Sequence, residues 1–248
     1  MEISVITVCK DAEKTIQDCL RSVSNQTVSA EHLIIDGDSK DDTKNIVRNF
    51  ESNAELKIIS EPDEGLYDAM NKGVMAARGD IIGILNSDDV FADNQVLARV
   101  RRALENTDEA GCYGNLIYVD RLDTGMTRRT WRAGNFARQK FFWGWMVPHP
   151  TMYLRREVYE RYGLYRKDLS TAADYELMIR LFVKHRVRLQ YVDELIVKMR
   201  VGGRSNVDVK ARLRANSMDR KAWSLNGVKP YPWTITLKPI RKINQFFS

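Results

Sequence analysis

Residues 80–89 read Asp-Ile-Ile-Gly-Ile-Leu-Asn-Ser-Asp-Asp, an apolar run that ends in two adjacent carboxylates. The run 80–85 has the length and composition of a strand buried on both faces, as in a parallel sheet covered by helices. Asp88 and Asp89 follow it directly, and neighbouring carboxylates repel each other unless a cation lies near them. The stretch therefore predicts a buried strand with a cation site at its end. The alternative is that Ser87 and Asp88 only cap the next turn.

The same alternation of short apolar runs and helical patterns extends over the first hundred residues. Strands are expected at 3–8, 33–35 and 56–59, and the segments between them carry apolar residues at helical spacing. This pattern predicts an α/β fold with a mostly parallel sheet flanked by helices. Ligands of such sheets bind at the carboxyl ends of the strands, where Asp36 and Asp38 also lie.

The second half of the chain is less regular. Residues 111–119 and 151–154 have strand patterns, 172–184 has a helical one, and 207–225 is expected to form a basic helix. The simplest organisation is one domain over 1–228, with halves 1–110 and 111–228, followed by an amphipathic basic tail at 229–248.

Charge divides the chain unevenly. Residues 1–124 contain 13 Lys and Arg against 24 Asp and Glu, and residues 125–248 contain 26 against 9. An acidic half suits metal coordination and hydrogen bonds to ribose or base, whereas a basic half suits phosphates of a lipid headgroup, a diphosphate or nucleic acid.

Cysteine usage and hydropathy bear on location. The three cysteines have no CxxC spacing and are expected to be buried thiols in a reducing compartment. The N-terminus lacks the basic region of a signal peptide, and no apolar run approaches the ~20 residues that span a bilayer. The expected location is the cytoplasm, with peripheral contact at the inner face of the plasma membrane as an alternative.

Four motifs occur in a fixed order: Ser-Val-Ile-Thr-Val at 4–8, Ile-Ile-Asp-Gly-Asp-Ser at 34–39, Glu-Pro-Asp-Glu-Gly-Leu-Tyr-Asp-Ala-Met-Asn-Lys-Gly at 61–73 and Leu-Asn-Ser-Asp-Asp at 85–89. Together they resemble the inverting family 2 glycosyltransferases of the GT-A fold, closely over about the first 110 residues and loosely to about residue 205. The resemblance is greatest to bacterial enzymes that build exopolysaccharide, capsule or O-antigen units.

This resemblance implies a hexosyl- or N-acetylhexosaminyltransferase of bacterial surface polysaccharide synthesis. The donor would be a nucleotide-diphosphate sugar, with a UDP-sugar favoured. The acceptor would be a saccharide or a polyprenyl-diphosphate-linked saccharide. It also implies that 1–110 is the nucleotide-sugar-binding half and 111–228 the acceptor half.

The resemblance assigns contacts with the nucleotide to these side chains: Thr7, Val8, Asp36, Asp38, Asp68, Asn71, Lys72 and Asp88. It assigns the metal, Mg²⁺ or Mn²⁺, to Asp89, in keeping with the oxygen ligands that these ions prefer. The usual family pattern after the second strand is Asp-Asp/Gly-x-Ser, and this chain has Asp-Gly-Asp-Ser. Which of Asp36 and Asp38 contacts the base is therefore open.

Residues 172–177 read Ala-Ala-Asp-Tyr-Glu-Leu at the start of a predicted helix. An inverting transfer needs a carboxylate to accept the proton of the acceptor hydroxyl, and the family pattern places it at Asp174. The alternative role for Asp174 is a helix cap, and Glu176 is the second candidate for the base. His149, between two prolines, is assigned weakly to the acceptor site. Arg200 and Arg204 flank a Gly pair and either bind the diphosphate or belong to a surface loop.

The tail mixes aromatic and basic residues over 231–247. This composition suits an interfacial helix on anionic lipid, and equally a helix docked on the protein's own core. The alternative to an enzyme is a nucleic-acid-binding protein that uses the basic second half. The acidic first half would repel a phosphate backbone and no binding motif is present, so no nucleic-acid partner is expected.

Overall fold

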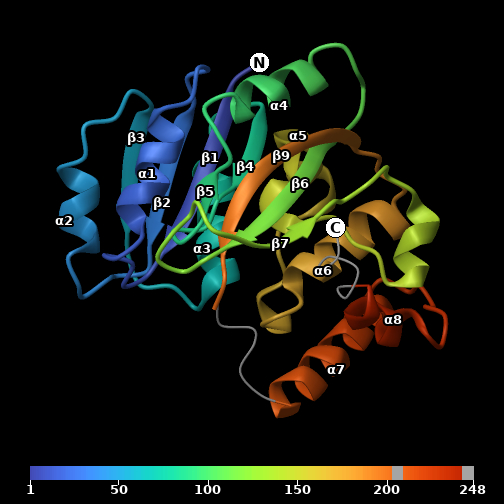
Figure 1. The fold of residues 1–248 in the computed structure, drawn as a ribbon. Helices are drawn as coiled ribbons and strands as arrows, with labels where there is room; N and C mark the ends of the chain where they lie inside the picture. Colours follow the sequence, from blue (N-terminus) through green and yellow to red (C-terminus); the bar gives the residue numbers. More distant parts are fainter. Residues whose placement is uncertain (203–208, 242–248) are drawn as a thin grey trace.

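A single sheet runs through the computed structural model, which describes residues 1–202 and 209–241 (Figure 1). Its main path has the order β3-β2-β1-β4-β8-β6-β9-β5, and β7 pairs with β6 outside that path. The strands of the described residues are β1 (Ile3–Cys9), β2 (Glu31–Asp36), β3 (Glu55–Ser60), β4 (Ile81–Ile84), β5 (Val90–Phe91), β6 (Gly111–Val119), β7 (Thr127–Trp131), β8 (Tyr153–Arg155) and β9 (Gln190–Arg200).

Strands β1 to β4 pair in parallel, as their apolar composition predicts. β1 lies between β2 and β4, and every residue of β1, β2 and β4 is buried. Helices α1 (Ile16–Ser24), α2 (Thr43–Arg48) and α3 (Leu66–Ala76) connect these strands, and α4 (Val96–Leu104) follows β5. The α/β fold class is therefore confirmed.

The second-half strands enter the sheet in an order that the sequence does not predict. β8 pairs antiparallel with β4 on one side and with β6 on the other, while β6 and β9 are parallel. β4, β6 and β9 therefore run in the same direction as β1 and β2. As a result, the ends of all five strands, from Cys9 to Arg200, lie on one edge of the sheet.

The remaining helices cover the second-half side. They are α5 (Arg156–Tyr162), α6 (Ala173–Met178) continued by a wider turn over Ile179–Lys184, α7 (Val209–Leu225) and α8 (Thr234–Ile240), with 3₁₀ turns η1 (Arg138–Trp143), η2 (His149–Thr151) and η3 (Lys167–Leu169). None of the described helices is both long and apolar enough to cross a bilayer.

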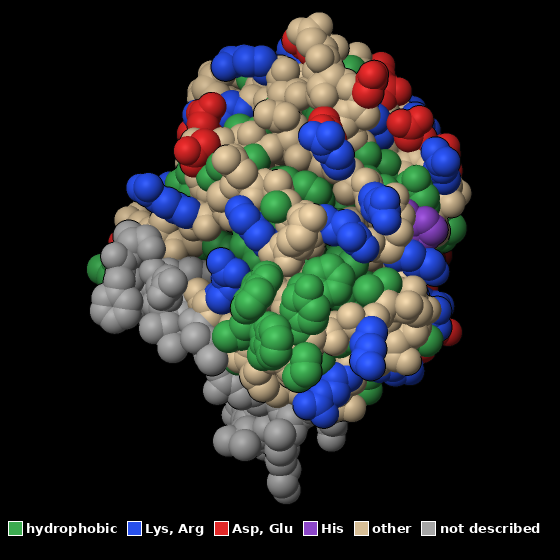
Figure 2. All heavy atoms as spheres, turned by 90° about the vertical axis from the view of Figure 1, so that its right-hand side faces the viewer, with side chains coloured by type: hydrophobic (Ala, Val, Ile, Leu, Met, Phe, Trp, Pro, Cys, Tyr) green, Lys and Arg blue, Asp and Glu red, His purple; other side chains and the backbone are tan. Residues whose placement is uncertain are grey.

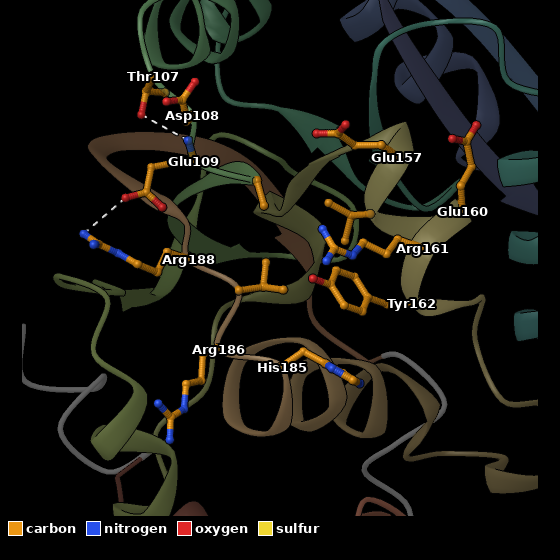
Figure 3. A pocket seen from close by; sticks show the side chains of 13 residues that line it. Thr107, Asp108, Glu109, Glu157, Glu160, Arg161, Tyr162, His185, Arg186 and Arg188 are labelled. Carbon is orange, nitrogen blue, oxygen red and sulfur yellow. Dashed lines mark hydrogen bonds and ion pairs between the residues drawn. The ribbon is translucent and has the colours of Figure 1, made fainter.

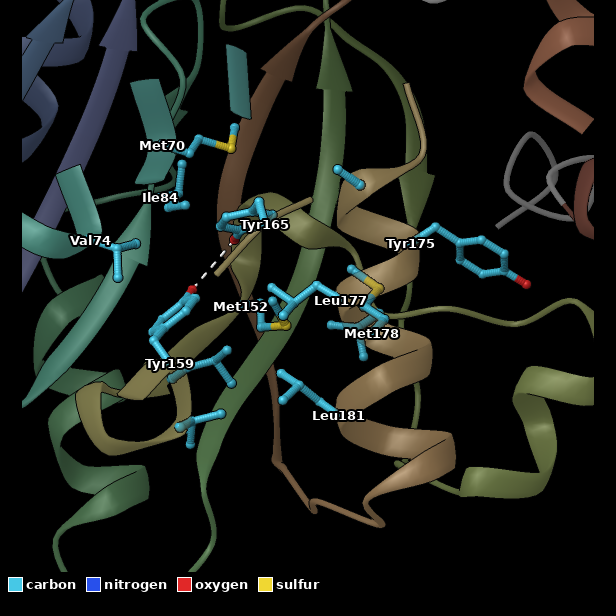
Figure 4. Close-up of a cluster of buried hydrophobic side chains, with 14 of the residues drawn as sticks. Met70, Val74, Ile84, Met152, Tyr159, Tyr165, Tyr175, Leu177, Met178 and Leu181 are labelled. Atoms are coloured by element: carbon cyan, nitrogen blue, oxygen red, sulfur yellow. Dashed lines mark hydrogen bonds between the residues drawn. The ribbon is translucent and has the colours of Figure 1, made fainter. Parts of the chain in front are cut away.

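The largest apolar core joins the two halves of the chain. Met70 and Val74 of α3 belong to the same buried cluster as Leu177, Met178 and Leu181 from α6 and its continuation (Figure 4). α7 extends this core, because Trp223 is fully buried and its Nε1 donates a 3.1 Å hydrogen bond to the hydroxyl of Tyr175. This shared core fixes α6 relative to the edge where the strands end.

Candidate active site

The turn after β4 holds a buried carboxylate with an unused oxygen. Asn86 Nδ2 donates to Asp89 Oδ2 at 3.0 Å, and Asp89 is 1% exposed. Asp89 Oδ1 and Asn86 Oδ1 are buried and have no hydrogen-bond partner among the described residues. Burial, and secondly the charge of Asp88, raise the pKa of Asp89 well above its usual range.

These features fit a divalent cation at the turn. An ion would supply the missing partner of Asp89 Oδ1 and offset the repulsion from half-buried Asp88. Within residues 1–202 and 209–241 no group of three or more His, Cys, Asp or Glu side chains could hold a metal by itself. The other ligands would therefore come from substrate phosphates and water, as is usual for Mg²⁺.

Arg200, at the end of β9, supports this turn from within the protein. Its Nη1 donates to the carbonyl oxygen of Asp88 at 2.7 Å, its Nη2 to Asp18 Oδ2 at 2.6 Å and its Nε to the carbonyl of Arg121 at 3.1 Å. The side chain is only 4% exposed. The guanidinium of Arg200 is therefore bonded to protein groups next to the turn, and it is not exposed in a surface loop. Arg204 lies outside the described residues.

The two aspartates after β2 have different surroundings. Asp36 is fully buried and accepts hydrogen bonds from the Ser39 hydroxyl, the Ser39 N–H at 3.2 Å and the Ser60 hydroxyl at 2.6 Å. Asp38 is partly exposed, and Lys40 and Lys44 hold the pKa of its carboxyl below the usual range. Of the two carboxylates, that of Asp38 is the more accessible to a ligand.

The β1 residues are buried at the same edge. Thr7 is fully buried, and its hydroxyl is 2.9 Å from His32 Nε2. Val8 is 4% exposed. A nucleoside could reach this position through the backbone rather than through the Thr7 hydroxyl, which already has a partner.

The residues of α3 that were predicted to contact the nucleotide have side-chain contacts with other parts of the protein. Asp68 Oδ1 accepts from Lys167 Nζ at 3.0 Å, and Lys72 Nζ lies 2.8 Å from Glu61 Oε1. The Asn71 side chain exchanges two 2.9 Å hydrogen bonds with the backbone N–H and carbonyl of Tyr165. Asn71 therefore ties α3 to a loop of the second half.

Asp174 lies in the first turn of α6 and is half-buried. Its Oδ1 accepts the Tyr67 hydroxyl at 3.2 Å and the Tyr175 N–H at 2.7 Å. Tyr67 comes from the start of α3, 107 residues away, and no local sequence pattern marks it as a partner of Asp174. Burial, and secondly the Asp174 charge, raise the pKa of Tyr67, so this phenol remains a proton donor.

His149 belongs to the same neighbourhood. Its Nε2 is 2.8 Å from the Tyr165 hydroxyl, and the Tyr165 ring stacks on Tyr67 at 5.7 Å. Burial lowers the pKa of His149, against an opposing effect of the Asp174 charge, so the imidazole is neutral at pH 7. η2, which holds His149, precedes antiparallel β8 and therefore lies at the edge where β4 ends.

Glu176 differs from Asp174 in having its charge already satisfied. It is 2% exposed, its Oε2 is 2.9 Å from Arg180 Nη2, and its Oε1 accepts from Asn226 at 3.0 Å. A buried and paired carboxylate cannot reach an acceptor hydroxyl, so the geometry favours Asp174 over Glu176 as a base.

A large cavity lies at the opposite edge of the sheet. It has a volume of about 940 Å³ and is lined by α5 and by residues 107–110 and 185–188, which precede β6 and β9 (Figure 3). Acidic side chains such as Glu157 and Glu160 and basic ones such as Arg186 and Arg188 face it. Since the strands begin here, this cavity is separate from the carboxylates described above.

Comparison with known proteins identifies the family of this chain. The model of the family "Glycosyl transferase family 2" matches residues 4–163. A PGL/p-HBAD biosynthesis glycosyltransferase of Mycobacterium bovis is 28% identical over 210 residues, which cover 83% of this chain and 80% of that one.

Two solved structures have the same GT-A type of fold. The S. aureus TarS 1-349 complex with UDP-GlcNAc has a TM-score of 0.66 at 16% identity and covers 100% of this chain and 73% of its own. The mannosyltransferase PcManGT from Pyrobaculum calidifontis, in complex with GDP-Man and Mn²⁺, has a TM-score of 0.68 at 18% identity, over 95% and 68% of the two chains. The chain is therefore a glycosyltransferase and belongs to glycosyl transferase family 2.

Proposed function

We propose that the protein transfers a sugar, with inversion, from a nucleotide-diphosphate donor to a hydroxyl of a saccharide or polyprenyl-diphosphate-linked saccharide in bacterial surface polysaccharide synthesis. A UDP-sugar is the favoured donor. The observation that carries the proposal is the pairing of two carboxylate centres at one edge of the sheet: the Asp88–Asp89 turn with its unpaired oxygen, and half-buried Asp174 held by Tyr67.

The donor would lie against the ends of β1, β2 and β4. Asp38 offers an accessible carboxylate to the base or ribose, and Asp88 a second one to the ribose or donor sugar. Asp89 would hold Mg²⁺ or Mn²⁺, which when bound neutralises charge on the diphosphate. Arg200 would position the Asp88–Asp89 turn through its bond to the Asp88 carbonyl.

The acceptor would approach Asp174. The acceptor's hydroxyl oxygen forms a bond to the anomeric carbon of the donor sugar, while the bond from that carbon to the diphosphate breaks. The proton passes to the Asp174 carboxylate, and the electron pair leaves with the nucleoside diphosphate. Tyr67 and the Tyr175 N–H hold one carboxylate oxygen, which leaves the other to accept the proton.

The test is a thermal-shift panel of UDP-, GDP- and dTDP-sugars with and without Mn²⁺. A ligand at about 100 times its Kd stabilises by about 2.7 kcal/mol, roughly 5–10 °C for a chain of this size. We expect one UDP-sugar to raise the melting temperature in a Mn²⁺-dependent manner. Asp89→Asn should remove the effect of Mn²⁺, because an amide oxygen carries no charge to hold the ion.

Absence of a shift with every nucleotide would contradict the donor site. A Mn²⁺-dependent shift that survives in Asp89→Asn would move the metal to Asp88. Asp174→Asn is the matched control, because that residue is assigned to the acceptor and its variant should keep the full shift.

A further inference from the structure

An exposed group of aromatic rings lies where η1 meets α8. Trp143 is 49% exposed, Tyr231 45% and Trp233 43%. Their ring centroids are 5.3–6.1 Å apart in all three pairs. We call these three residues the aromatic patch. They come from segments almost 90 residues apart in the sequence, so only the fold brings them together.

The two segments that carry the patch are joined by hydrogen bonds to the backbone. Thr234 Oγ1 donates to the Phe142 carbonyl at 2.6 Å, and Arg241 Nη1 to the Trp143 carbonyl at 3.3 Å. Gly144 has a φ of 75°, and a Cβ there would lie 2.6 Å from the backbone nitrogen of Lys238. The two segments thus approach backbone to backbone, and the rings are presented on a rigid base rather than on a loose tail.

The surroundings of the patch are basic. Basic residues lie within a few positions of the three rings in the sequence: Arg138, Lys140, Lys229, Lys238 and Arg241. The acidic side chain paired with one of them, Asp219, is buried, and its Oδ2 accepts from Lys238 Nζ at 2.8 Å. η1 and α8 lie on the right of Figure 1, the side that faces the viewer in Figure 2. On that face hydrophobic side chains gather in the lower part with Lys and Arg around them, whereas Asp and Glu lie mainly higher up (Figure 2).

This combination has a specific ligand chemistry. Trp and Tyr are amphipathic rings that favour the headgroup level of a bilayer, and nearby Lys and Arg are attracted to anionic lipid phosphates. A neutral saccharide could also stack on aromatic rings, but it carries no charge for the neighbouring Lys and Arg side chains to contact. The charge pattern therefore favours an anionic lipid surface over a neutral glycan.

The patch is also connected to the acceptor side of the site. The Phe142 ring packs on Trp223 at 5.2 Å, and Trp223 Nε1 donates to the Tyr175 hydroxyl at 3.1 Å. Tyr175 follows Asp174 in α6. Partly buried Phe142 and fully buried Trp223 thus join the exposed patch to the helix that carries the proposed base.

We propose that the aromatic patch seats the protein on an anionic lipid bilayer. The rings of Trp143, Tyr231 and Trp233 enter the headgroup region, and the flanking cations contact lipid phosphates. The docked protein presents α6 toward a lipid-linked acceptor; this last point rests on the proposed function, whereas the lipid contact itself does not.

The experiment is flotation of the full chain with vesicles of phosphatidylcholine alone or mixed with phosphatidylglycerol. We expect binding to the mixed vesicles that weakens as salt is raised, because salt screens the contact between cations and lipid. Trp143→Ser combined with Trp233→Ser should weaken binding at least about tenfold, since binding scales with the apolar area that enters the interface. Leu122→Ser, at a 92% exposed leucine of the β6–β7 turn outside the patch, is the matched control and should bind as the unchanged chain does.

A second pair of variants tests the same contact if the double tryptophan variant does not fold. Lys140→Gln and Lys229→Gln change the charge three residues before Trp143 and two before Tyr231 without touching the rings. Each should weaken binding to anionic vesicles roughly fivefold, from about 1 kcal/mol per basic residue near the surface.

Equal binding to neutral and anionic vesicles, or unchanged binding of both the tryptophan and the lysine variants, would overturn the proposal. Retention by a neutral oligosaccharide that depends on the two tryptophans, without vesicle binding, would also overturn it and make the patch a glycan platform. The readout needs neither donor nor turnover. A failure here therefore leaves the nucleotide thermal shift untouched, and the two proposals can fail separately.

Discussion

At the scale of single residues, the two carboxylates of α6 show how partners decide a role. Asp174 and Glu176 lie in the same helical turn and have similar chemistry. Glu176 is buried and satisfied by Arg180 and Asn226, whereas Asp174 is half-buried and held on one oxygen by Tyr67. Only Asp174 retains an oxygen with which to accept a proton from a substrate.

We therefore expect Asp174→Asn to lower kcat by about 10²–10⁴-fold, the usual contribution of a positioned general base. The fold should persist, because the asparagine oxygen still accepts the Tyr67 hydroxyl. Steady-state transfer assays on both chains check this. Glu176→Gln should instead lower the free energy of unfolding and keep the turnover per folded molecule. Turnover near that of the unchanged chain in Asp174→Asn would remove this residue from the mechanism.

A second residue-scale prediction concerns pH. His32 is fully buried, and burial lowers its pKa from 6.5 to about 3. Below pH 6.5 the unfolded chain takes up a proton at His32 that the folded chain does not. Stability is therefore lost as the pH falls from 6.5 toward 3, by about 2 kcal/mol at pH 5.

Urea unfolding at pH 7 and pH 5 measures this loss. The difference between the two pH values should be about 2 kcal/mol smaller in His32→Gln than in the unchanged chain. Comparing the two chains cancels the contributions of other titrating groups. An equal pH dependence in both would show that His32 is protonated in the folded protein.

At the scale of elements, one side chain joins three of them. Arg200 connects the end of β9 to the turn between β4 and β5 and to Asp18 of α1. It is buried, and its positive charge partly offsets the effect of burial on Asp89. The proposed cation site thus depends on a strand more than a hundred residues further along the chain.

Arg200→Ala should cost about 2–5 kcal/mol in the free energy of unfolding, because it removes three hydrogen bonds and leaves a cavity where the buried side chain lay. Asp18→Asn, which removes only the half-exposed partner, should cost less than about 1 kcal/mol. Denaturant unfolding of both variants makes the comparison. A small loss in Arg200→Ala, similar to that of Asp18→Asn, would contradict a supporting role for the guanidinium.

At the scale of the whole molecule, the two halves share one sheet. β8 lies between β4 and β6, and β5 of the first half pairs with β9 of the second. Asn71 and Tyr67 add hydrogen bonds from the first half to Tyr165 and Asp174. Neither the core nor the site is complete in one half alone.

A fragment of residues 1–110 should therefore lack a cooperative thermal transition. It would expose the edge of β4 that β8 covers and leave β5 unpaired, and exposed apolar strand edges promote association. Circular dichroism on heating checks this, with the full chain as the control. A cooperative melt of the fragment would show that the nucleotide half folds as an independent domain.

The sequence by itself determined the parallel strands β1 to β4 and the edge of the sheet at which the proposed ligand-binding residues lie. Apolar runs predicted β1, β3, β4 and β6 to within a residue or two at each end, and the middle of β2. β1, β2 and β4 are buried throughout, whereas β3 is partly exposed. The four ordered motifs gave the family. These signals are local, because each depends on residues adjacent along the chain.

Only the tertiary structure decided which side chains meet. β8 is three residues long, too short for its pattern to reveal that it enters between β4 and β6. From the sequence, Asp36 and Asp38 were equal candidates for contact with the base. In the structure Asp36 is buried and hydrogen-bonded to Ser39 and Ser60, whereas Asp38 is partly exposed. The bond from Tyr67 to Asp174 and the joining of Trp143 with Trp233 depend on packing across about 90 to 110 residues. Such contacts follow from the path of the whole chain, which no local periodicity specifies.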